Sequence, residues 1–207
     1  MKIGIFISGT GTNMSAIIKN FREGLLKGVA GISFVLSDKN NAGGIIKAQE
    51  EGIETIVLPK QKNELRSDYE LRLLSTIFEY GTEIIVLAGF MKILGNVFLN
   101  GYKGKVINIH PSLLPSFKGV NAQKQAFDYG VRISGCTTHF VDETLDEGPI
   151  ILQTAVERKE NDTHETFKNR ILAREHKILS ESISIVATGQ YSISHRMVLL
   201  DRRSYEI

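Results

Sequence analysis

The chain has 207 residues, of which 42% are hydrophobic and 23% are charged, as is ordinary for a globular protein. This length allows one α/β domain, or two closely joined lobes, with a sizeable core. The formal net charge of +2 is too small to argue for nucleic acid as a partner, although a local positive field can still hold a small anion.

The number of cysteines and the length of the apolar segments exclude several further classes of protein. The only cysteine, Cys136, excludes an internal disulfide, and no Cys/His cluster has the spacing of zinc ligands, so we expect no metal site. The apolar run near the N-terminus is shorter than that of a signal peptide, and no segment is long enough to span a membrane. We therefore expect a cytoplasmic protein whose partners are small molecules, not nucleic acid or membrane. Self-association into a homodimer stays open.

The first half of the chain alternates between strand and helix patterns. Apolar runs predict strands over residues 3–7, 32–36, 55–58 and 84–88. Helical spacing of apolar residues predicts helices from residue 14 (Met14, Ile17, Ile18 and Phe21), over 44–51, and over 64–79 (Leu65, Tyr69, Leu73 and Ile77). Strands that alternate with helices favour a parallel sheet with right-handed crossovers. The pattern predicts a Rossmann-like, doubly wound half.

The second half has a different pattern. Residues 105–109 are typical of one more strand, ended by Pro111, and residues 133–141 and 150–156 of an antiparallel pair joined by an acidic loop. We expect a long helix over 163–187, with Asp162 and Glu165 as its capping pair and Gly189 as its stop. A short strand is expected near 197–200. The predicted fold class is α/β: a mostly parallel sheet with an antiparallel C-terminal extension and a long C-terminal helix.

We expect one domain over residues 1–207, with halves at 1–104 and 105–190 and a tail at 191–207. The basic residues of the tail (Arg196, Arg202 and Arg203) are expected to be solvated.

A glycine-rich turn, residues 8–13, follows the first strand and opens the first helix. Backbone N–H groups and the positive end of a helix form an anion site in this position, and Gly9 and Gly11 allow a close approach. Met14 stands where a dinucleotide-binding loop has its third Gly or Ala, so a single phosphate is the better prediction. The alternative is a tight βα turn with Thr12 or Asn13 as the helix cap.

Asn108 and His110 alternate on the strand at 105–109 and so share one face near its carboxyl end, where open α/β sheets border their ligand crevice. This pair suits acyl transfer, because an amide and a protonated imidazole can both donate to a tetrahedral oxyanion. A protonated histidine needs a nearby carboxylate. The acidic loop offers four, among which spacing does not choose: Asp142, Glu143, Asp146 and Glu147. The alternative is that His110 is a structural residue whose ring is hydrogen-bonded within the protein, and that the loop acids are simply exposed to solvent.

Several motifs, in order along residues 1–190, resemble those of the folate-dependent formyltransferases, most of all the members that act on glycinamide ribonucleotide. They are Ser-Gly-Thr-Gly-Thr-Asn at 8–13, Leu-Ala-Gly-Phe-Met at 87–91, Asn-Ile-His-Pro-Ser-Leu-Leu-Pro at 108–115, Thr-His-Phe-Val at 138–141, Leu-Asp-Glu-Gly-Pro at 145–149 and Glu-His at 175–176. The combination is far more specific than any one motif. The resemblance implies transfer of the formyl group of 10-formyltetrahydrofolate, a cosubstrate, to the amine of N1-(5-phosphoribosyl)glycinamide in de novo purine (IMP) synthesis.

The resemblance also implies roles for residues. Asn108, His110 and Asp146 would form the catalytic set, with Asp146 favouring the protonated form of His110. The substrate would be bound by residues that hold its phosphate (Gly11, Thr12 and Asn13) and by residues that approach its ribose and glycinamide (Leu172, Ala173, Arg174 and Glu175). The folate would lie against Arg66, Met91, Lys92, Ile93, Leu94, Asn108, Asp142, Glu143, Thr144, Leu145 and Asp146. His139 is expected to be structural.

One observation supports the last helix independently. Glu175 shares a helical face with Ile171, Ile178 and Leu179, and a carboxylate on an apolar stripe needs a polar partner or a cavity. Three positions depart from the family pattern and bear on affinity more than on activity: Lys92 for Arg, Asn121 for His, and Leu172 for a polar residue.

Other functions fit less well. Methionyl-tRNA formyltransferase and formyltetrahydrofolate hydrolase resemble this lobe but carry a further domain, and sugar-nucleotide formyltransferases usually lack the glycine-rich turn. A dinucleotide-dependent oxidoreductase is disfavoured by Met14. A binding module without catalysis has no need of a proton relay formed by Asn108, His110 and Asp146.

Overall fold

A computed structural model describes residues 1–201 of the chain. The structure divides into two compact units, Met1–Asn108 and a second that begins at Ile109. The predicted α/β fold class is confirmed. Of the expected basic tail, Arg202 and Arg203 lie outside the described residues. In the part of the chain that the structure describes, no helix has the length and apolar character needed to cross a bilayer.

The first unit contains a parallel sheet with strand order β3-β2-β1-β4-β5. Its strands are β1 (Lys2–Ile7), β2 (Gly31–Ser37), β3 (Thr55–Val57), β4 (Ile84–Leu87) and β5 (Lys105–His110). Ile5 of β1 lies opposite Val35 of β2 on one side and Val86 of β4 on the other. All four residues of β4 are buried, which explains its unbroken apolar sequence. The predicted Rossmann-like half is therefore present.

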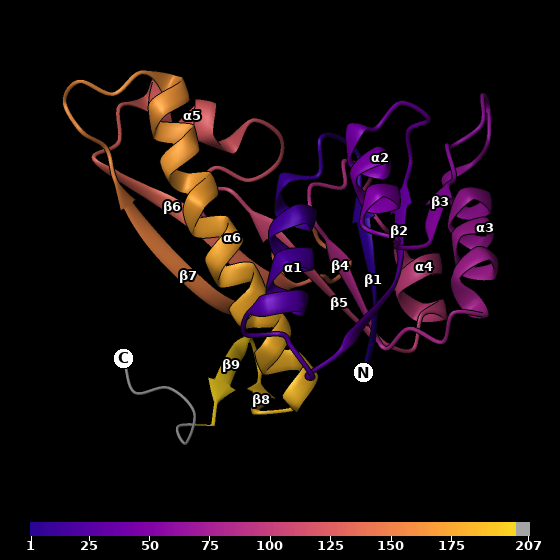
Figure 1. The fold of residues 1–207 in the computed structure, drawn as a ribbon. Helices are drawn as coiled ribbons and strands as arrows, with labels where there is room; N and C mark the ends of the chain where they lie inside the picture. The colour runs from indigo at the N-terminus through magenta and orange to yellow at the C-terminus, as the bar shows by residue number, and fades with distance from the viewer. Residues whose placement is uncertain (202–207) are drawn as a thin grey trace. The chain divides into compact units, whose positions relative to one another are not determined.

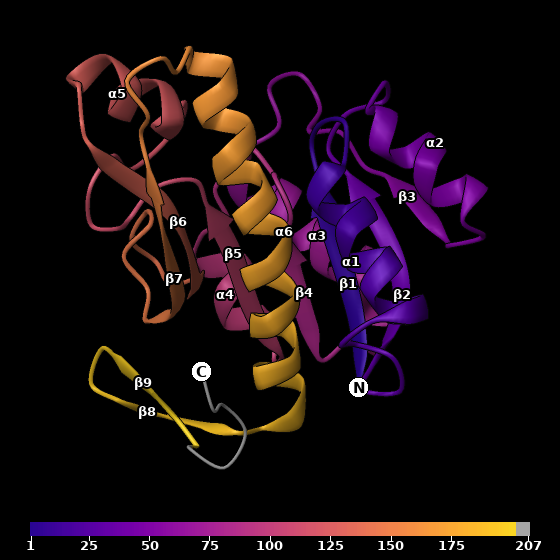
Figure 2. The same ribbon diagram turned by 60° about the vertical axis from the view of Figure 1, so that its left-hand side comes forward.

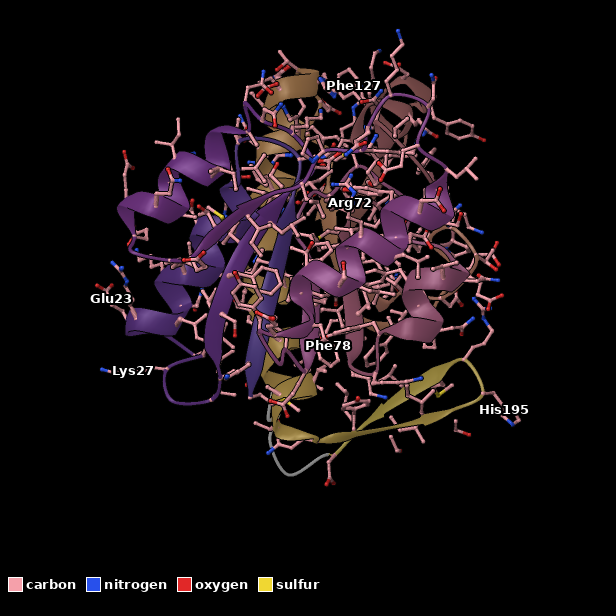
Figure 3. The ribbon with its side chains drawn as sticks, turned by 90° about the vertical axis from the view of Figure 1, so that its right-hand side faces the viewer. Glu23, Lys27, Arg72, Phe78, Phe127 and His195 are labelled. Atoms are coloured by element: carbon pink, nitrogen blue, oxygen red, sulfur yellow. The ribbon has the colours of Figure 1, made fainter. Side chains whose placement is uncertain are left out.

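Four helices accompany this sheet: α1 (Thr12–Glu23), α2 (Gly43–Glu50), α3 (Arg66–Phe78) and α4 (Asn96–Gly101). α1 packs beside α2, and α3 beside α4, on opposite faces of the strands (Figures 2 and 3). The predicted apolar faces are buried apart from two residues: Phe21 of α1 is half-buried, and Leu65, which precedes α3 as its N-cap residue, is 66% exposed. The helix α4 was not predicted, because six residues are too few to show a helical period.

The core of the first unit is an aromatic cluster around Phe6, which is completely buried. Its ring lies 5.2 Å from that of Phe90, 6.0 Å from that of Phe98 and 6.3 Å from that of Phe34, measured between centroids. Tilted and edge-on pairs are favourable because the positive edge of one aromatic ring approaches the negative face of the other. The cluster therefore fixes β1 against the segment that follows β4.

The second unit contains an antiparallel pair, β6 (Ile133–Phe140) and β7 (Ile150–Glu157), as predicted. The helices α5 (Ala122–Tyr129) and α6 (His164–Thr188) pack together, and α6 also packs along β6 and β7 (Figure 1). A hairpin of β8 (Tyr191–Ser194) and β9 (Met197–Leu200) follows, with Met197 opposite Ile150 of β7. His195 lies at the hairpin turn and points outward (Figure 3). The strand β9 was predicted, whereas α5 and β8 were not.

The start of α6 differs from the prediction. Its N-cap residue is Thr163, and the capping box joins Thr163 to Thr166, not Asp162 to Glu165. Asp162 instead accepts hydrogen bonds from Thr166 Oγ1 at 2.9 Å and from both terminal nitrogens of Arg170. The Arg170 guanidinium holds the pKa of the Asp162 carboxyl well below its usual range. Gly189 ends the helix in the left-handed conformation (φ 68°), as predicted.

Candidate functional site

The glycine-rich turn connects the end of β1 to α1. Gly11 is the N-cap residue and adopts φ 70°, so the helix begins at Thr12, and the cap at Thr12 or Asn13 that the alternative interpretation included is wrong. Gly9 accepts a hydrogen bond from Gly44 N–H at 3.0 Å, and Thr10 accepts one from Lys47 Nζ at 3.0 Å. The turn therefore rests on the start of α2 and keeps a lysine beside it. This environment suits an anion such as a phosphate.

Ser8 links this turn to the segment after β4. Its hydroxyl donates to Asp38 Oδ1 at 2.5 Å and accepts from Met91 N–H at 2.7 Å, and its own N–H donates to Gly89 O at 3.0 Å. The side chain of Asp38 is buried at the end of β2, and the sequence analysis missed it. A signal was available, because Asp38 directly follows a strand of a parallel sheet.

The segment predicted to bind folate runs from Met91 to Leu94, between β4 and α4. Met91, Lys92 and Ile93 are exposed, whereas Leu94 is 3% exposed and anchors the segment in the core. The exposed side chains of Met91 and Ile93 form an apolar surface, and Lys92 adds one positive charge that a ligand can reach. The structure thus keeps these residues accessible, Lys92 included.

The two polar residues of β5 lie at its carboxyl end, two positions apart. Asn108 is half-buried, and His110 is 4% exposed. The Nε2 atom of His110 is 2.8 Å from Phe117 O, a carbonyl that can only accept. Nε2 therefore carries a proton in this conformation. Phe117 itself has φ 54°, an uncommon backbone conformation for a bulky residue.

Asp146 is the loop carboxylate that faces His110. Its Oδ2 atom lies 3.4 Å from His110 Nδ1 and accepts a hydrogen bond from Gly119 N–H at 2.8 Å. The side chain is 7% exposed, and the residue adopts φ 54°. The other acids have different surroundings: Asp142 accepts from Thr144 N–H within its own loop, Glu147 pairs with Lys118, and Glu143 is exposed. Of the four carboxylates that the spacing did not distinguish, Asp146 is therefore the one that lies beside the His110 ring.

His139 also lies beside Asp146. The ring is 2% exposed, with Nδ1 2.8 Å from Phe140 O and Nε2 3.8 Å from Asp146 Oδ1. Burial lowers the pKa of His139 below its ordinary value, which favours the neutral ring. The expectation of a purely structural histidine omitted this contact. The carboxylate of Asp146 thus lies between two imidazoles.

A model of the formyl transferase family matches residues 1–183. The chain belongs to this family. It is 44% identical to the trifunctional purine biosynthetic protein adenosine-3 of Bos taurus over 188 residues, which are 91% of this chain and 18% of that protein. It is 40% identical to the phosphoribosylglycinamide formyltransferase of Bacillus subtilis over 176 residues, 85% of this chain and 89% of that protein. Glycinamide ribonucleotide transformylase 1 from Symbiobacterium toebii has a similar crystal structure, with a TM-score of 0.92 at 40% identity, covering 97% of this chain and 93% of that chain.

This family member carries the predicted carboxylate on α6. Glu175 is 5% exposed within a buried stripe that includes Ile171, Ile178 and Leu179, as predicted. It accepts a hydrogen bond from Gln123 Nε2 of α5 at 3.3 Å. Gln123 was missed, because α5 itself was not predicted. Leu172 is half-buried, and Ala173 and Arg174 are exposed.

Asn121 contributes to the start of α5 through its backbone conformation. Asn121 is the N-cap residue of α5 and adopts φ 58°. Asparagine tolerates this left-handed conformation better than most residues. Asparagine at this position is therefore compatible with the start of α5.

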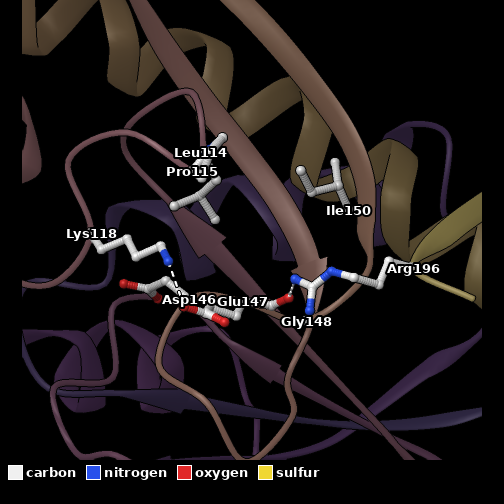
Figure 4. Close-up of a pocket in the computed structure, with 8 residues that line it drawn as sticks. All are labelled: Leu114, Pro115, Lys118, Asp146, Glu147, Gly148, Ile150 and Arg196. Atoms are coloured by element: carbon white, nitrogen blue, oxygen red, sulfur yellow. Dashed lines mark hydrogen bonds and ion pairs between the residues drawn. The ribbon is translucent and has the colours of Figure 1, made fainter.

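A pocket of about 390 Å³ borders Asp146 within the second unit. Its lining is shown in Figure 4: Leu114, Pro115, Lys118, Asp146, Glu147, Gly148, Ile150 and Arg196. Lys118 pairs with Glu147 at 2.6 Å, and Arg196 of the hairpin turn donates to the main-chain oxygen of Glu147. Arg196 was expected to be solvated, but it contacts the acidic loop. Within residues 1–201, no group of three or more His, Cys, Asp or Glu side chains is arranged to hold a metal ion.

Proposed function

We propose that the protein transfers the formyl group of 10-formyltetrahydrofolate to the amine of glycinamide ribonucleotide. The observation that carries the proposal is the contact between His110 and Asp146, 3.4 Å apart at the end of β5. The carboxylate orients the imidazole ring, which formyl transfer would use as a hydrogen-bond donor and an acid. The Bacillus subtilis relative named phosphoribosylglycinamide formyltransferase and the Symbiobacterium toebii structure named glycinamide ribonucleotide transformylase 1 support the choice of substrate. The single buried cysteine suits the reducing cytoplasm.

The binding roles follow the chemistry of each segment. The glycine-rich turn (Gly11, Thr12 and Asn13) would take the phosphate of the ribonucleotide, because it combines a helix N-terminus with close backbone approach. Glu175 would accept hydrogen bonds from the ribose and glycinamide, with Leu172, Ala173 and Arg174 beside it. By the family resemblance, the residues that contact the folate would be Arg66, 91–94, Asn108 and the acidic loop 142–146.

The reaction itself would need three side chains. The substrate amine attacks the formyl carbon, and the amide of Asn108 and the imidazolium of His110 donate hydrogen bonds to the resulting oxyanion. The bond from carbon to the folate nitrogen then breaks, and His110 gives a proton to that nitrogen. Asp146 takes the proton that the amine loses, directly or through water. For this, His110 must exchange its present bond to Phe117 O for one to the substrate.

The test is a direct assay of formyl transfer. Purified protein is mixed with 10-formyltetrahydrofolate, or its 5,8-dideaza analogue, with and without glycinamide ribonucleotide, and deformylation is followed by absorbance. Turnover that requires the ribonucleotide supports the proposal. Turnover without it would identify a hydrolase, and no turnover while folate still binds would point to another acceptor.

A further inference from the structure

A buried carboxylate lies beneath the segment proposed to bind folate. Glu70 of α3 is 2% exposed, and its side chain accepts three hydrogen bonds. The donors are Gly95 N–H at 2.7 Å, Phe98 N–H at 3.0 Å and Arg66 Nε at 2.7 Å. Because a buried carboxylate is costly without partners, these bonds are strongly favoured over a loosened arrangement. One side chain thus fixes two separate pieces of the proposed folate site.

The first piece is the junction between 91–94 and α4. Gly95 is the N-cap residue of α4 and has no side chain with which to cap it. Glu70 supplies the capping oxygens from a different helix, and the negative charge suits the positive end of α4. A helix of six residues is marginal without such support. The position of Leu94, the buried anchor of the segment, therefore depends on Glu70.

The second piece is the guanidinium of Arg66. It lies so close to Gly95 that a Cβ atom at that position would overlap Arg66 Nη2. Glu70 holds the Nε edge, and the side chain of Arg66 is 53% exposed. A guanidinium held at one edge presents its other N–H groups in a fixed direction, as a fork suited to a carboxylate. Folates carry carboxylates on their glutamate.

We propose that Glu70 is a positioning residue that sets the affinity for the folate donor. It acts by holding Arg66 and the 91–95 segment in one arrangement, and it touches neither the formyl group nor the amine. This inference rests on the proposed function, because it assumes that folate lies on Arg66 and 91–94.

The test compares Michaelis constants for the two substrates in Glu70→Gln and wild-type enzyme. Glutamine has one acceptor oxygen, so at least one of the three donors then faces an amide NH₂. The Michaelis constant for 10-formyltetrahydrofolate should rise about tenfold, as expected for losing a hydrogen bond to a charged group. The constant for the ribonucleotide and kcat at saturating folate should change less than about twofold.

A matched control is Glu64→Gln. Glu64 also pairs with an arginine, Arg72 at 2.9 Å, and its side chain accepts hydrogen bonds from Arg72 and from Gln61 N–H, both of which lie outside the 91–95 segment. The control should leave the folate constant unchanged. Equal effects of the two variants would mean that Glu70 acts only through stability.

Two further variants keep the test informative if Glu70→Gln folds poorly. Arg66→Ala removes an exposed side chain, and Gly95→Ala displaces its guanidinium without altering Glu70. Both should raise the folate constant selectively, and Glu70→Gln should add less in an Arg66→Ala background than alone. A fall in kcat with an unchanged folate constant, or silent Arg66 and Gly95 variants in an enzyme that still transfers formyl groups, would overturn the positioning role. Absence of transfer by the wild type would instead refute the proposed function.

Discussion

The carboxylate of Asp146 faces the imidazole of His110 across 3.4 Å, on the ring nitrogen that Phe117 does not occupy. A carbonyl and an ionised carboxylate can only accept hydrogen bonds, so each offers the imidazole ring an acceptor. The two ring nitrogens of His110 thus face one acceptor each before any substrate is bound. The arrangement also occupies Nε2 with Phe117 O, whose release would free a donor for the oxyanion.

We expect His110→Ala to lower kcat by about a hundredfold to ten-thousandfold, because an acid and an oxyanion donor are lost together. Steady-state formyl transfer at saturating substrates measures this. The control is His195→Ala, since His195 is an exposed histidine at the turn of the β8–β9 hairpin. Near-normal turnover by His110→Ala would remove it from the catalytic set.

The contact between α2 and the glycine-rich turn gives a second prediction. A Cβ at Gly44 would overlap Ile7 Cδ1 and lie 3.1 Å from the backbone of Gly11, whereas a Cβ at Gly43 meets nothing within 4 Å. Gly44→Ala should therefore displace the turn and raise the Michaelis constant for the ribonucleotide by about tenfold or more, while the folate constant changes little. Gly43→Ala should leave both constants unchanged. Similar kinetics of the two variants would argue against a phosphate site at this turn.

The sequence predicted those elements whose own pattern determines them. Long apolar runs and helical periods identified β1, β4, α3 and α6, because burial of a whole strand or of one helix face is visible in the residues themselves. By contrast, α4 depends on the distant carboxylate of Glu70, α5 begins at a left-handed Asn121, and β8 requires its partner β9. Because these elements are stabilised by contacts with distant residues, the local sequence shows no periodic pattern from which they could be predicted.

The candidate site divides in the same way. Alternation along β5 predicted that Asn108 and His110 share a face, but four nearby acids were equivalent by spacing. Asp146 is distinguished by a left-handed backbone and by the N–H of Gly119, neither of which a sequence period encodes. Glu70 was missed because it acts through residues distant in the chain, and Gln123 because α5 was not predicted. Asp38 was missed although its position directly after β2 gave a signal.

The observed cap of α6 gives a prediction about stability. Thr163→Ala removes the oxygen that accepts from Thr166 N–H at 3.2 Å and should lower the free energy of unfolding by about 1 kcal/mol. Glu165→Gln should cost only a few tenths, roughly 0.3 kcal/mol, because its charge at the first turn is solvent-exposed. Urea unfolding followed by circular dichroism measures both. A larger loss from Glu165→Gln would restore the capping pair predicted from sequence.

Cys136 gives a prediction that depends on pH. Burial on β6, together with the nearby carboxylate of Glu175, raises the pKa of its thiol from 9.0 to about 12. Only the thiolate reacts readily with iodoacetamide, so at pH 8 the folded protein should be alkylated about a thousandfold more slowly than the unfolded chain.

The same shift makes the stability of the fold fall at alkaline pH. The folded state keeps a proton that the unfolded state releases, so the stabilisation is complete below pH 9 and is lost as the pH rises from 9 toward 12. Cys136→Ala has no thiol to titrate and should show a shallower alkaline decline in urea unfolding than the wild type. Parallel declines in the two proteins, or rapid alkylation of the folded wild type at pH 8, would show that the thiol is not held protonated by burial.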